Sequence, residues 1–352
     1  MRYTFDYPNR MNIFDRICLE AFRLLVGECT PRALLAGCLF LALGNAAQAA
    51  GPFLYVVDGM ANAVSVVDSS NNTITATITG FSGPRQDAIN SAGTRLYVAN
   101  DGNGSVSVVD LTLSPPAIIN TISGFTGSVG VALNSSGSVL YVGNHGANLV
   151  SIVATSNNAV TGVITGLTDP RYLAVSPDGS SLYVTSDSTG SLYLVNTSNN
   201  TVTATITGFD QPKSLAFNPS GSLLYVANEA NNTISVVNTG TNTITAAIAD
   251  PSFNLPTGVA VSSSGAILYV ANEGTNAVSV LATSNDSLIT TIPGFSIPYG
   301  IALSPGAAPP VTPIAPSWIL MLSGLAILWA WQMTRSRRPA ARAWGQRRAT
   351  PG

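Results

Sequence analysis

Hydrophobic and polar positions alternate in short runs along most of the chain, and these runs recur in a fixed order. The run Leu-Tyr-Val opens each of six copies, which start at Leu54, Leu96, Leu140, Leu182, Leu224 and Leu268. In the fourth copy the alternation has a period of two and predicts strands at residues 182–185, 191–195, 201–206 and 213–217. Asn-rich, Ser-Gly and Asp-Gly turns separate the runs. The pattern therefore predicts an all-β protein built from units of four antiparallel strands.

The spacing of the copies predicts a β-propeller. Successive copies are offset by 42, 44, 42, 42 and 44 residues, and a period near 40 residues with strand content supplies one four-stranded blade per repeat. The first copy lacks the strand that precedes Leu-Tyr-Val elsewhere, whereas residues 298–304 form such a strand with no Leu-Tyr-Val after it. Pairing these N- and C-terminal strands removes the open edges. We therefore expect a six-bladed β-propeller over residues 50–305.

The segment before the repeats reads as an export signal. Residues 1–49 contain arginines, an apolar run at residues 33–43 and the small-residue cleavage motif Ala47-Gln48-Ala49. A lipoprotein signal ending at Cys38 is an alternative, although few apolar residues precede that site. We expect the mature, exported protein to begin near Ala50.

The segment after the repeats changes composition abruptly. Residues 306–316 form a Pro/Ala-rich linker, and residues 317–334 are long and apolar enough for a transmembrane helix. Arginines crowd residues 335–352, which places that tail in the cytoplasm by the positive-inside rule. The sequence therefore predicts a propeller held at the membrane or cell surface, outside the cytoplasm.

Composition and charge narrow the classes of function. The chain is 46% hydrophobic and 9% charged, which suits folded β structure better than disorder. Residues 50–310 carry 13 acidic and four basic side chains, a formal balance of −9, and a nucleic-acid binder needs the opposite sign. The three cysteines, Cys18, Cys29 and Cys38, all precede the repeats, so the mature protein has no thiol for a zinc cluster or a nucleophile.

Two resemblances follow from these residues. The strands at residues 96–100, 224–228 and 268–272 read Leu-Tyr-Val-Ala-Asn and resemble the signature of the YVTN family of β-propeller repeats. That resemblance covers residues 53–304 and implies an exported or surface propeller, in a family whose members commonly have seven blades. The tail, beginning at residues 313–318, is loosely similar to the PEP-CTERM and IPTL-CTERM sorting signals.

One register of the repeat is basic. It is occupied in turn by Arg85, Val129, Arg171, Lys213, Thr257 and Tyr299. The family resemblance implies that this strand lines the central channel and starts at its mouth, where a cationic rim suits a carboxylate or phosphate. The ligand-binding candidates at this mouth are Arg85, Asp87, Arg171, Tyr172, Lys213 and Tyr299.

A second register is acidic and follows the Leu-Tyr-Val strand. Its candidate metal ligands are Asp101, Asp187, Glu229 and Glu273. Oxygen ligands that converge on one face are suited to Ca²⁺, the one cofactor we consider. The alternative is that these acids are ordinary turn residues, or that they neutralise the bases of the neighbouring register.

Residues suited to catalysis are few. His145 is the single histidine, and Asp101 or Asp187 is its candidate acid/base partner. Asp87 stands where the other copies have apolar residues, and we consider Arg85 as its partner. We favour a non-enzymatic, surface-anchored module that binds a protein or glycan. The alternatives are a lactonase-like, metal-dependent propeller hydrolase and a structural surface-layer component.

Overall fold

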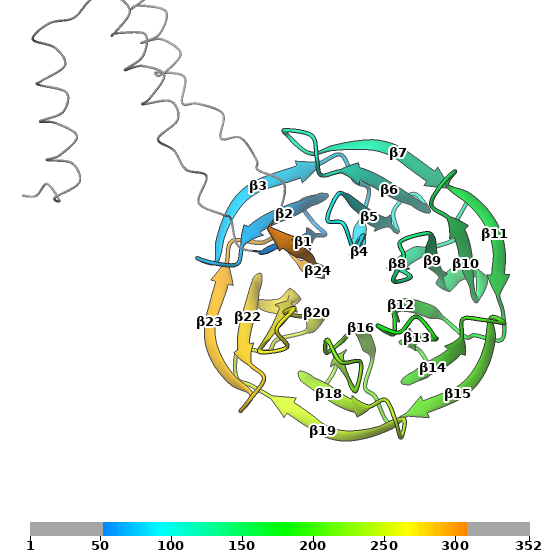
Figure 1. Cartoon of the computed structure of the whole chain (residues 1–352). Coiled ribbons are helices and arrows are strands. Elements are labelled where there is room, and N and C mark those ends of the chain that lie inside the picture. The colour runs from blue at the N-terminus through cyan, green and yellow to red at the C-terminus, as the bar shows by residue number, and fades with distance from the viewer. Residues whose placement is uncertain (1–51, 308–352) are drawn as a thin grey trace, which may run out of the picture. The chain divides into compact units, whose positions relative to one another are not determined.

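The fold is a ring of six antiparallel sheets around a central channel (Figure 1). The computed structural model describes residues 52–307, and these residues form 24 strands with four in each sheet. The predicted six-bladed, all-β propeller is therefore confirmed. Among these residues no helix is long and apolar enough to cross a membrane. The predicted export signal, residues 308–316 of the predicted linker, the transmembrane helix and the Arg-rich tail lie outside the described residues.

Each blade runs from an inner strand at the channel to an outer strand at the rim of the disc (Figure 1). Blade 1 consists of β24 (Pro298–Ala307), β1 (Pro52–Asp58), β2 (Ala63–Asp68) and β3 (Thr73–Thr79). Blade 2 consists of β4 (Pro84–Ile89), β5 (Arg95–Asn100), β6 (Ser105–Asp110) and β7 (Ala117–Ser123). Blade 3 consists of β8 (Ser128–Leu133), β9 (Val139–Asn144), β10 (Leu149–Ala154) and β11 (Ala159–Ile164), with the short 3₁₀ turn η1 (His145–Ala147).

The remaining blades repeat this plan. Blade 4 consists of β12 (Pro170–Val175), β13 (Ser181–Ser186), β14 (Ser191–Asn196) and β15 (Thr201–Thr207). Blade 5 consists of β16 (Pro212–Phe217), β17 (Leu223–Asn228), β18 (Thr233–Asn238) and β19 (Thr243–Ala249). Blade 6 consists of β20 (Pro256–Val261), β21 (Ile267–Asn272), β22 (Ala277–Ala282) and β23 (Ser287–Pro293), with the 3₁₀ turn η2 (Glu273–Thr275).

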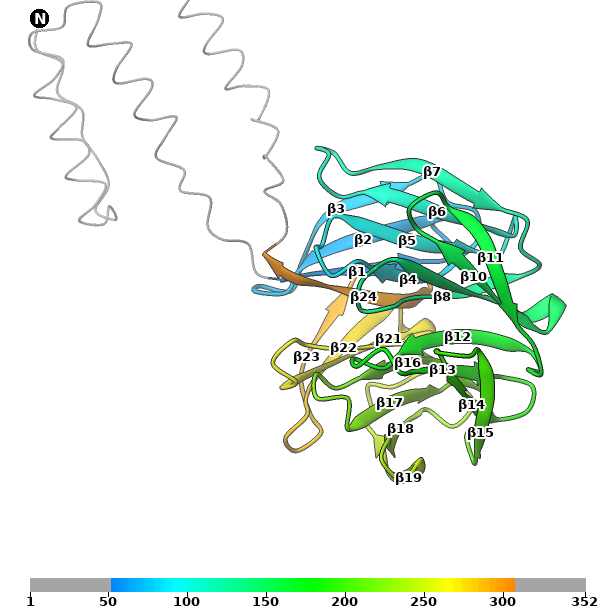
Figure 2. The same ribbon diagram turned by 45° about the vertical axis from the view of Figure 1, so that its right-hand side comes forward.

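Blade 1 closes the ring in the way that the two ends of the repeat array predict. Strand β24 lies beside β1 in both views of the ribbon (Figure 2), and the two strands pair antiparallel with Leu54 opposite Leu303. The amide of Phe53 also donates a hydrogen bond to the Ser304 hydroxyl at 2.8 Å. The first and last described strands therefore share one sheet, and β24 extends two residues beyond the predicted domain end at residue 305.

The local sequence explains why these strands form and stop. In the second and third strands of a blade, such as β1 and β2, nearly every residue is buried, because both faces pack on neighbouring blades. The outer strand β3 exposes most of its length and carries several threonines, which suit an open sheet face. Asn158 and Asn200 adopt left-handed backbone with φ of 58° and 59°, as expected for Asn-rich turns.

The core consists of six hydrophobic clusters, one between each pair of adjacent blades. The fourth residue of each inner strand faces the preceding blade and joins the cluster there. In five blades this residue is apolar: Val131, Leu173, Leu215, Val259 and Ile301. In blade 2 it is Asp87, which faces the closing blade.

Candidate binding site at the mouth of the channel

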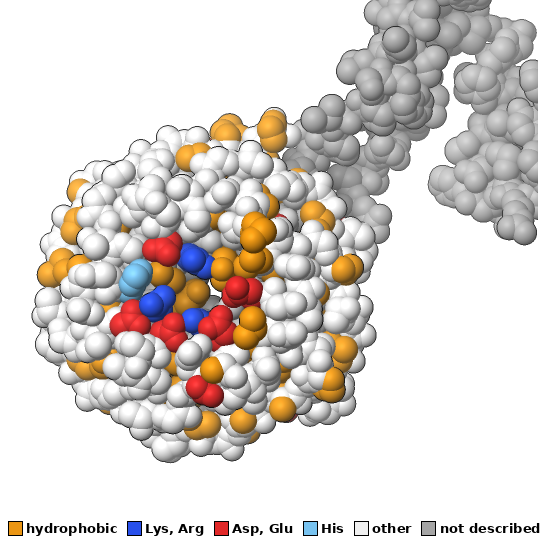
Figure 3. Space-filling view, turned by 180° about the vertical axis from the view of Figure 1, so that it is seen from behind, with side chains coloured by type: hydrophobic (Ala, Val, Ile, Leu, Met, Phe, Trp, Pro, Cys, Tyr) orange, Lys and Arg blue, Asp and Glu red, His pale blue; other side chains and the backbone are white. Residues whose placement is uncertain are grey.

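Charged side chains gather around one mouth of the channel. Figure 3 shows acidic, basic and histidine side chains in an arc around this opening, with hydrophobic side chains on the remaining part of its edge. The inner strands start at this mouth, and the loops that follow the second strands end there. We call the resulting set of side chains the charged rim; its members are Arg85, Asp101, His145, Asp169, Arg171, Asp187, Lys213, Glu229 and Glu273.

Lys213 is the most enclosed cation of the rim. Its Nζ lies 2.7 Å from an oxygen of Asp187 in blade 4 and 3.0 Å from an oxygen of Glu229 in its own blade. The side chain is only 12% exposed, so water screens both pairs weakly. Lys213 therefore links blades 4 and 5 through two carboxylates.

Arg171 and Asp169 extend the chain of ion pairs. The Nε of Arg171 donates to Asp169 at 3.0 Å and lies 3.6 Å from Asp187. The second oxygen of Asp169 accepts a hydrogen bond from the Ser188 amide at 3.0 Å. A surface cavity of about 460 Å³ opens beside these residues, lined also by Asp210 and Gln211.

Arg85 and His145 complete the charged arc. The Arg85 guanidinium lies over the Tyr299 ring at 4.3 Å from its centroid, and its Nε lies 3.6 Å from Asp101. Burial acts to lower the pKa of Arg85, but the Tyr299 and Tyr172 hydroxyls and Asp101 outweigh it, so the net direction is upward. His145 lies between two carboxylates, with Nε2 3.6 Å from Asp101 and Nδ1 3.8 Å from Asp169.

The alternation of acid and base stops in blade 6. Burial raises the pKa of Glu273, the neighbouring Glu229 carboxylate raises it further, and Arg85 and Lys213 offset this only in part. In blades 2, 4 and 5 a base occupies the second position of the inner strand, whereas blade 6 has Thr257 there. Thr257 is buried and donates a hydrogen bond to the Pro298 carbonyl at 2.8 Å.

Two buried side chains, Gln86 and Tyr172, lie below the mouth. The Gln86 carboxamide crosses the channel: its oxygen accepts from the amides of Val131 at 3.2 Å and Leu173 at 3.3 Å, and its nitrogen donates to the Leu173 carbonyl at 3.3 Å. Tyr172 is 4% exposed, and burial raises the pKa of its hydroxyl. The charged groups acting on that hydroxyl include Arg85 and Glu229, so it lies at the base of the rim.

Asp87 is not part of this rim, which corrects part of the expected site. It is 5% exposed, and neither of its carboxylate oxygens has a hydrogen-bond partner of normal geometry among the described residues. Arg85, its expected partner, contacts Tyr299 and Asp101 instead. Burial raises the pKa of Asp87 well above its ordinary value, and the nearby amides of Asp87 and Ala302 offset this only in part.

Gly300 of β24 accounts for how closely Asp87 packs on the closing blade. A Cβ placed on Gly300 would lie 2.9 Å from an oxygen of Asp87 and 2.8 Å from the Cα of Gln86. Only glycine therefore permits this approach of β24 to β4. The Asp87 carboxyl is buried in the interface between blades 1 and 2, against the cluster that contains Tyr55 and Val98.

The other expected site residues do meet at the mouth. Arg85, Arg171, Tyr172, Lys213 and Tyr299 all act on one another or on shared neighbours there. Lys213 pairs with the acids Asp187 and Glu229, and Asp101 lies between Arg85 and His145. This is the alternative considered from the sequence, in which the acids of one register neutralise the bases of the neighbouring one. Within residues 52–307, no group of three or more His, Cys, Asp or Glu side chains is placed to hold a metal ion. Binding of Ca²⁺ stays a prediction.

The polar residues just before the acidic register have a structural role. The side chain of Asn100 donates to Ser107 at 2.9 Å and accepts from the Ser82 amide at 3.2 Å. Asn144, Asn228 and Asn272 make the same pair of contacts in their blades. These buried amides tie each second strand to the loop entering its inner strand.

Two residues at the mouth were not among the candidates predicted from the sequence. Asp169 lies in the loop before β12 rather than in either charged register, and the available signal was an acid at the position that is Gly83 or Gly127 in other copies. Its φ there is 47°. At the register of Gln86 the other copies have Gly130, Tyr172, Ser214, Gly258 and Gly300, so no repeated pattern marked Gln86.

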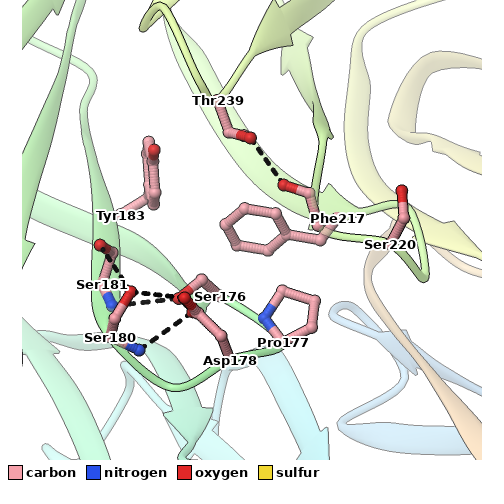
Figure 4. A pocket seen from close by; sticks show the side chains of 10 residues that line it. Ser176, Pro177, Asp178, Ser180, Ser181, Tyr183, Phe217, Ser220 and Thr239 are labelled. Carbon is pink, nitrogen blue, oxygen red and sulfur yellow. Dashed lines mark hydrogen bonds between the residues drawn. The ribbon is translucent and has the colours of Figure 1, made fainter.

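A smaller hollow of about 190 Å³ lies between blades 4 and 5 at the opposite end of the strands. Figure 4 shows that its polar groups serve the local turn: Asp178 accepts hydrogen bonds from Ser176 and from the Ser180 amide. The wall is formed by Tyr183 and Phe217, whose rings meet edge to face at 5.4 Å. Because these groups satisfy one another, the mouth with the charged rim is the stronger candidate site.

Solved structures share the fold at low sequence identity. A chain of the Kuenenia stuttgartiensis hydrazine synthase is 16% identical with a TM-score of 0.53, covering 66% of this chain and 93% of that one. A functionally unknown protein from Desulfotomaculum acetoxidans DSM 771 is 16% identical with a TM-score of 0.56, covering 72% and 98%. A chain of a nidogen/laminin complex is 16% identical with a TM-score of 0.61, also covering 72% and 98%. These similarities establish the fold alone.

No curated protein matches the sequence significantly. A family model described as "Lactonase, 7-bladed beta-propeller" matches residues 49–209 and 211–297, which is more than half of the chain. The match ends just before β24, the strand that closes the ring here with six blades rather than seven. The protein therefore belongs to this lactonase-type β-propeller family and is a six-bladed member of it.

Proposed function

We propose that the protein is an exported binding module that takes a protein or glycan partner at the charged rim. The observation that carries this proposal is the gathering of charged side chains at one mouth of the channel, with Gln86 and Tyr172 buried below them. A partner therefore meets a polar and asymmetric surface. Such a surface offers many hydrogen-bonding groups and suits an extended partner better than a small enclosed ligand.

The rim is already organised before any partner arrives. Lys213, Arg171 and Arg85 are each held by carboxylates or an aromatic ring, so their side chains have little freedom left to lose. Binding to such fixed groups requires less ordering of side chains than binding to flexible ones. The ion pairs thus preorganise the mouth.

The test compares matched variants of the full chain on arrays of polysaccharides and peptides. Arg171→Gln alters the rim, whereas Arg95→Gln removes a base that pairs with Asp110 at 2.7 Å, away from the mouth. We expect Arg171→Gln to abolish the signals that wild type gives and Arg95→Gln to retain them. Equal signals from both variants would contradict a binding site at the rim.

Surface display is part of the same proposal. The leader, residues 1–49, and the apolar segment, residues 317–334, support export followed by membrane anchoring, and the similarity to YVTN repeats and C-terminal sorting signals points the same way. Protease added to intact cells should digest the propeller if it is displayed. Digestion only after cell lysis would refute display.

A second candidate is a lactonase-like hydrolase, which the family match favours. His145 between Asp101 and Asp169 is the candidate base for activating water. Hydrolysis of a model lactone, measured with and without Ca²⁺, should fall at least about 100-fold in His145→Gln if this reading holds. An unchanged rate in that variant, or none in wild type, would remove it.

A further inference from the structure

The repeats of the propeller show that blade 6 lacks a cation at the mouth. In blades 2, 4 and 5 the acid after the second strand pairs with a base on the inner strand of the same blade: Arg85–Asp101 at 3.6 Å, Arg171–Asp187 at 3.6 Å and Lys213–Glu229 at 3.0 Å. Blade 6 has the acid, Glu273, but Thr257 in place of the base. No base lies within ion-pair distance of Glu273 among residues 52–307. The repeat therefore leaves one position where an external cation completes the pattern.

The environment of Glu273 favours a positive charge. Glu229 raises the pKa of Glu273, so the two carboxylates are neighbours in this part of the rim. The nearest paired cation is Lys213, which contacts Glu229 at 3.0 Å. Two neighbouring carboxylates repel each other when both are ionised, and a bound cation relieves that repulsion. An anionic partner would have to overcome it.

The rim beside Glu273 is apolar rather than charged. Met60 is 68% exposed and Leu255 is 38% exposed, and the partly exposed Ile297 lies between the loops that carry them. Backbone hydrogen bonds hold these loops within each blade: the Glu273 amide donates to the Leu255 carbonyl at 3.0 Å in blade 6, and the Gly59 amide donates to the Ile297 carbonyl at 3.0 Å in blade 1. We call Met60, Leu255 and Ile297 the apolar strip.

Two residues of the apolar strip adopt an unfavourable backbone conformation. Leu255 and Ile297 have φ of 51° and 57°, at a position where blades 2 and 3 are entered through Gly83 and Gly127. A left-handed conformation is uncommon for residues other than glycine and costs roughly 1–3 kcal/mol. Asp169 and Gln211 adopt the same conformation in blades 4 and 5, so what distinguishes blades 6 and 1 is a partly exposed apolar side chain at this position.

Tyr172 of blade 4 lies at the base of the rim. Its side chain is more than nine-tenths buried. Arg85, Tyr299 and Glu229 are among the groups that act on its hydroxyl. A phenol oxygen can accept a hydrogen bond from an ammonium group.

We propose that the mouth between blades 5, 6 and 1 binds a lysine side chain from a protein partner, with the apolar residues beside that lysine packed on the apolar strip. The ammonium group then lies between Glu273 and Glu229 and takes the place of the missing base. A protein segment fits better than a free amine, because Met60 and Leu255 extend the contact surface outward from the carboxylates. This inference rests on the proposed binding function and specifies its ligand.

The test uses the full chain and three fluorescent peptides that share a leucine-flanked central residue. That residue is lysine, acetyl-lysine or glutamate. We expect the lysine peptide to bind wild type and the other two to bind at least about tenfold more weakly, since each loses the charge pair. Binding of all three peptides with equal affinity would show that the apolar strip alone holds them and would overturn the proposal.

Variants of the protein locate the effect. Glu273→Gln should weaken the lysine peptide about tenfold. Asp286→Asn is the matched control, because it also removes one acidic charge, lies in the β22–β23 turn at the other end of the strands, and installs the residue that Asn200 and Asn242 provide in other copies. Thr257→Lys supplies the missing base internally and should abolish peptide binding, provided that its melting temperature shows a folded chain.

The outcomes separate this inference from the proposed function. Loss of peptide binding in Glu273→Gln with retention in Asp286→Asn supports the inference. Equal loss in both variants, or no binding of the lysine peptide to wild type, overturns it. If the lysine peptide does not bind wild type, but polysaccharides or peptides on the arrays still bind wild type and not Arg171→Gln, the rim remains a binding site for another class of partner.

Discussion

Replacing Asp87 by valine is expected to stabilise the propeller. Asp87 is the one polar residue in a register that is otherwise Val131, Leu173, Leu215, Val259 and Ile301. Valine has nearly the same shape as aspartate and already occupies the register in blades 3 and 6, so it fits against Gly300 without displacing β24. The substitution removes a buried carboxyl and adds apolar contact between blades 1 and 2.

Two contributions set the size of the effect. A polar group buried without a hydrogen bond costs about 1–3 kcal/mol in proteins, and burying a valine side chain contributes about 1.5–3 kcal/mol. Because the interface relaxes only in part, we expect a gain of at least about 2 kcal/mol in the free energy of unfolding at pH 7. For a domain of this size that corresponds to a rise of about 4–8 °C in melting temperature.

The pH dependence identifies the carboxyl as the cause. The raised pKa of Asp87 means that the native state holds a proton that the unfolded chain releases above about pH 4. Wild-type stability therefore falls as pH rises from about 4 toward the native pKa of Asp87, by up to about 1.4 kcal/mol per pH unit from this group. The advantage of Asp87→Val should be smallest near pH 4 and grow toward pH 7.

The assay is urea denaturation of wild type, Asp87→Val and Asp87→Asn at pH 4 and pH 7. Asparagine removes the titration but keeps a buried polar group, so it should gain only the pH-dependent part. Val131→Asp is the reverse control, because it places an acid at the same register between blades 2 and 3, and it should lose stability with rising pH. If the advantage of Asp87→Val is absent at both values, or is equal at both, the reasoning is refuted.

Three further outcomes follow from the rim, the residues below it and the closing blade. Lys213→Met should lower the free energy of unfolding by about 2–3 kcal/mol, because two enclosed carboxylates lose their cation. Arg95→Met, the control, should lower it by less than about 1 kcal/mol. Equal losses of the two variants in urea denaturation would contradict this. Gln86→Ala should destabilise by about 2 kcal/mol and speed hydrogen exchange at the amides of Val131 and Leu173, and unchanged protection there would disprove the bridge. Burial, and secondly the Asp87 carboxylate, raise the pKa of Tyr55 to about 12, so ultraviolet titration of Asp87→Val should show one tyrosine ionising earlier than in wild type.

The architecture could be predicted from the sequence because the repeat carries it. Each copy specifies four strands, and the predicted strand at residues 182–185 is observed as β13, Ser181–Ser186, which is longer by one residue at each end. Closure was predictable because one strand was missing at the start and one was spare at the end. A propeller of stacked repeats leaves few other ways to pair those two strands.

Only those features of the site that recur at the same position of each repeat could be predicted from the sequence. Alignment of the copies placed Arg85, Arg171 and Lys213 at one level of the channel, which the structure bears out. It gave no information on contacts between blades, such as Lys213 with Asp187 across blades 4 and 5 or Gln86 reaching Leu173. Those contacts depend on side-chain length and on the angle between sheets, neither of which the repeat encodes.

The pairing of β24 with β1 also sets an order for biosynthesis. Blade 1 takes three strands from residues 52–79 and its fourth from residues 298–307, so its hydrogen bonds cannot be completed until the ribosome has translated nearly all of the described chain. Until then the β1 edge lacks a neighbour and is open to pairing with other chains. On the proposed export route, delivery of the polypeptide before β24 arrives would leave assembly of the ring to the far side of the membrane.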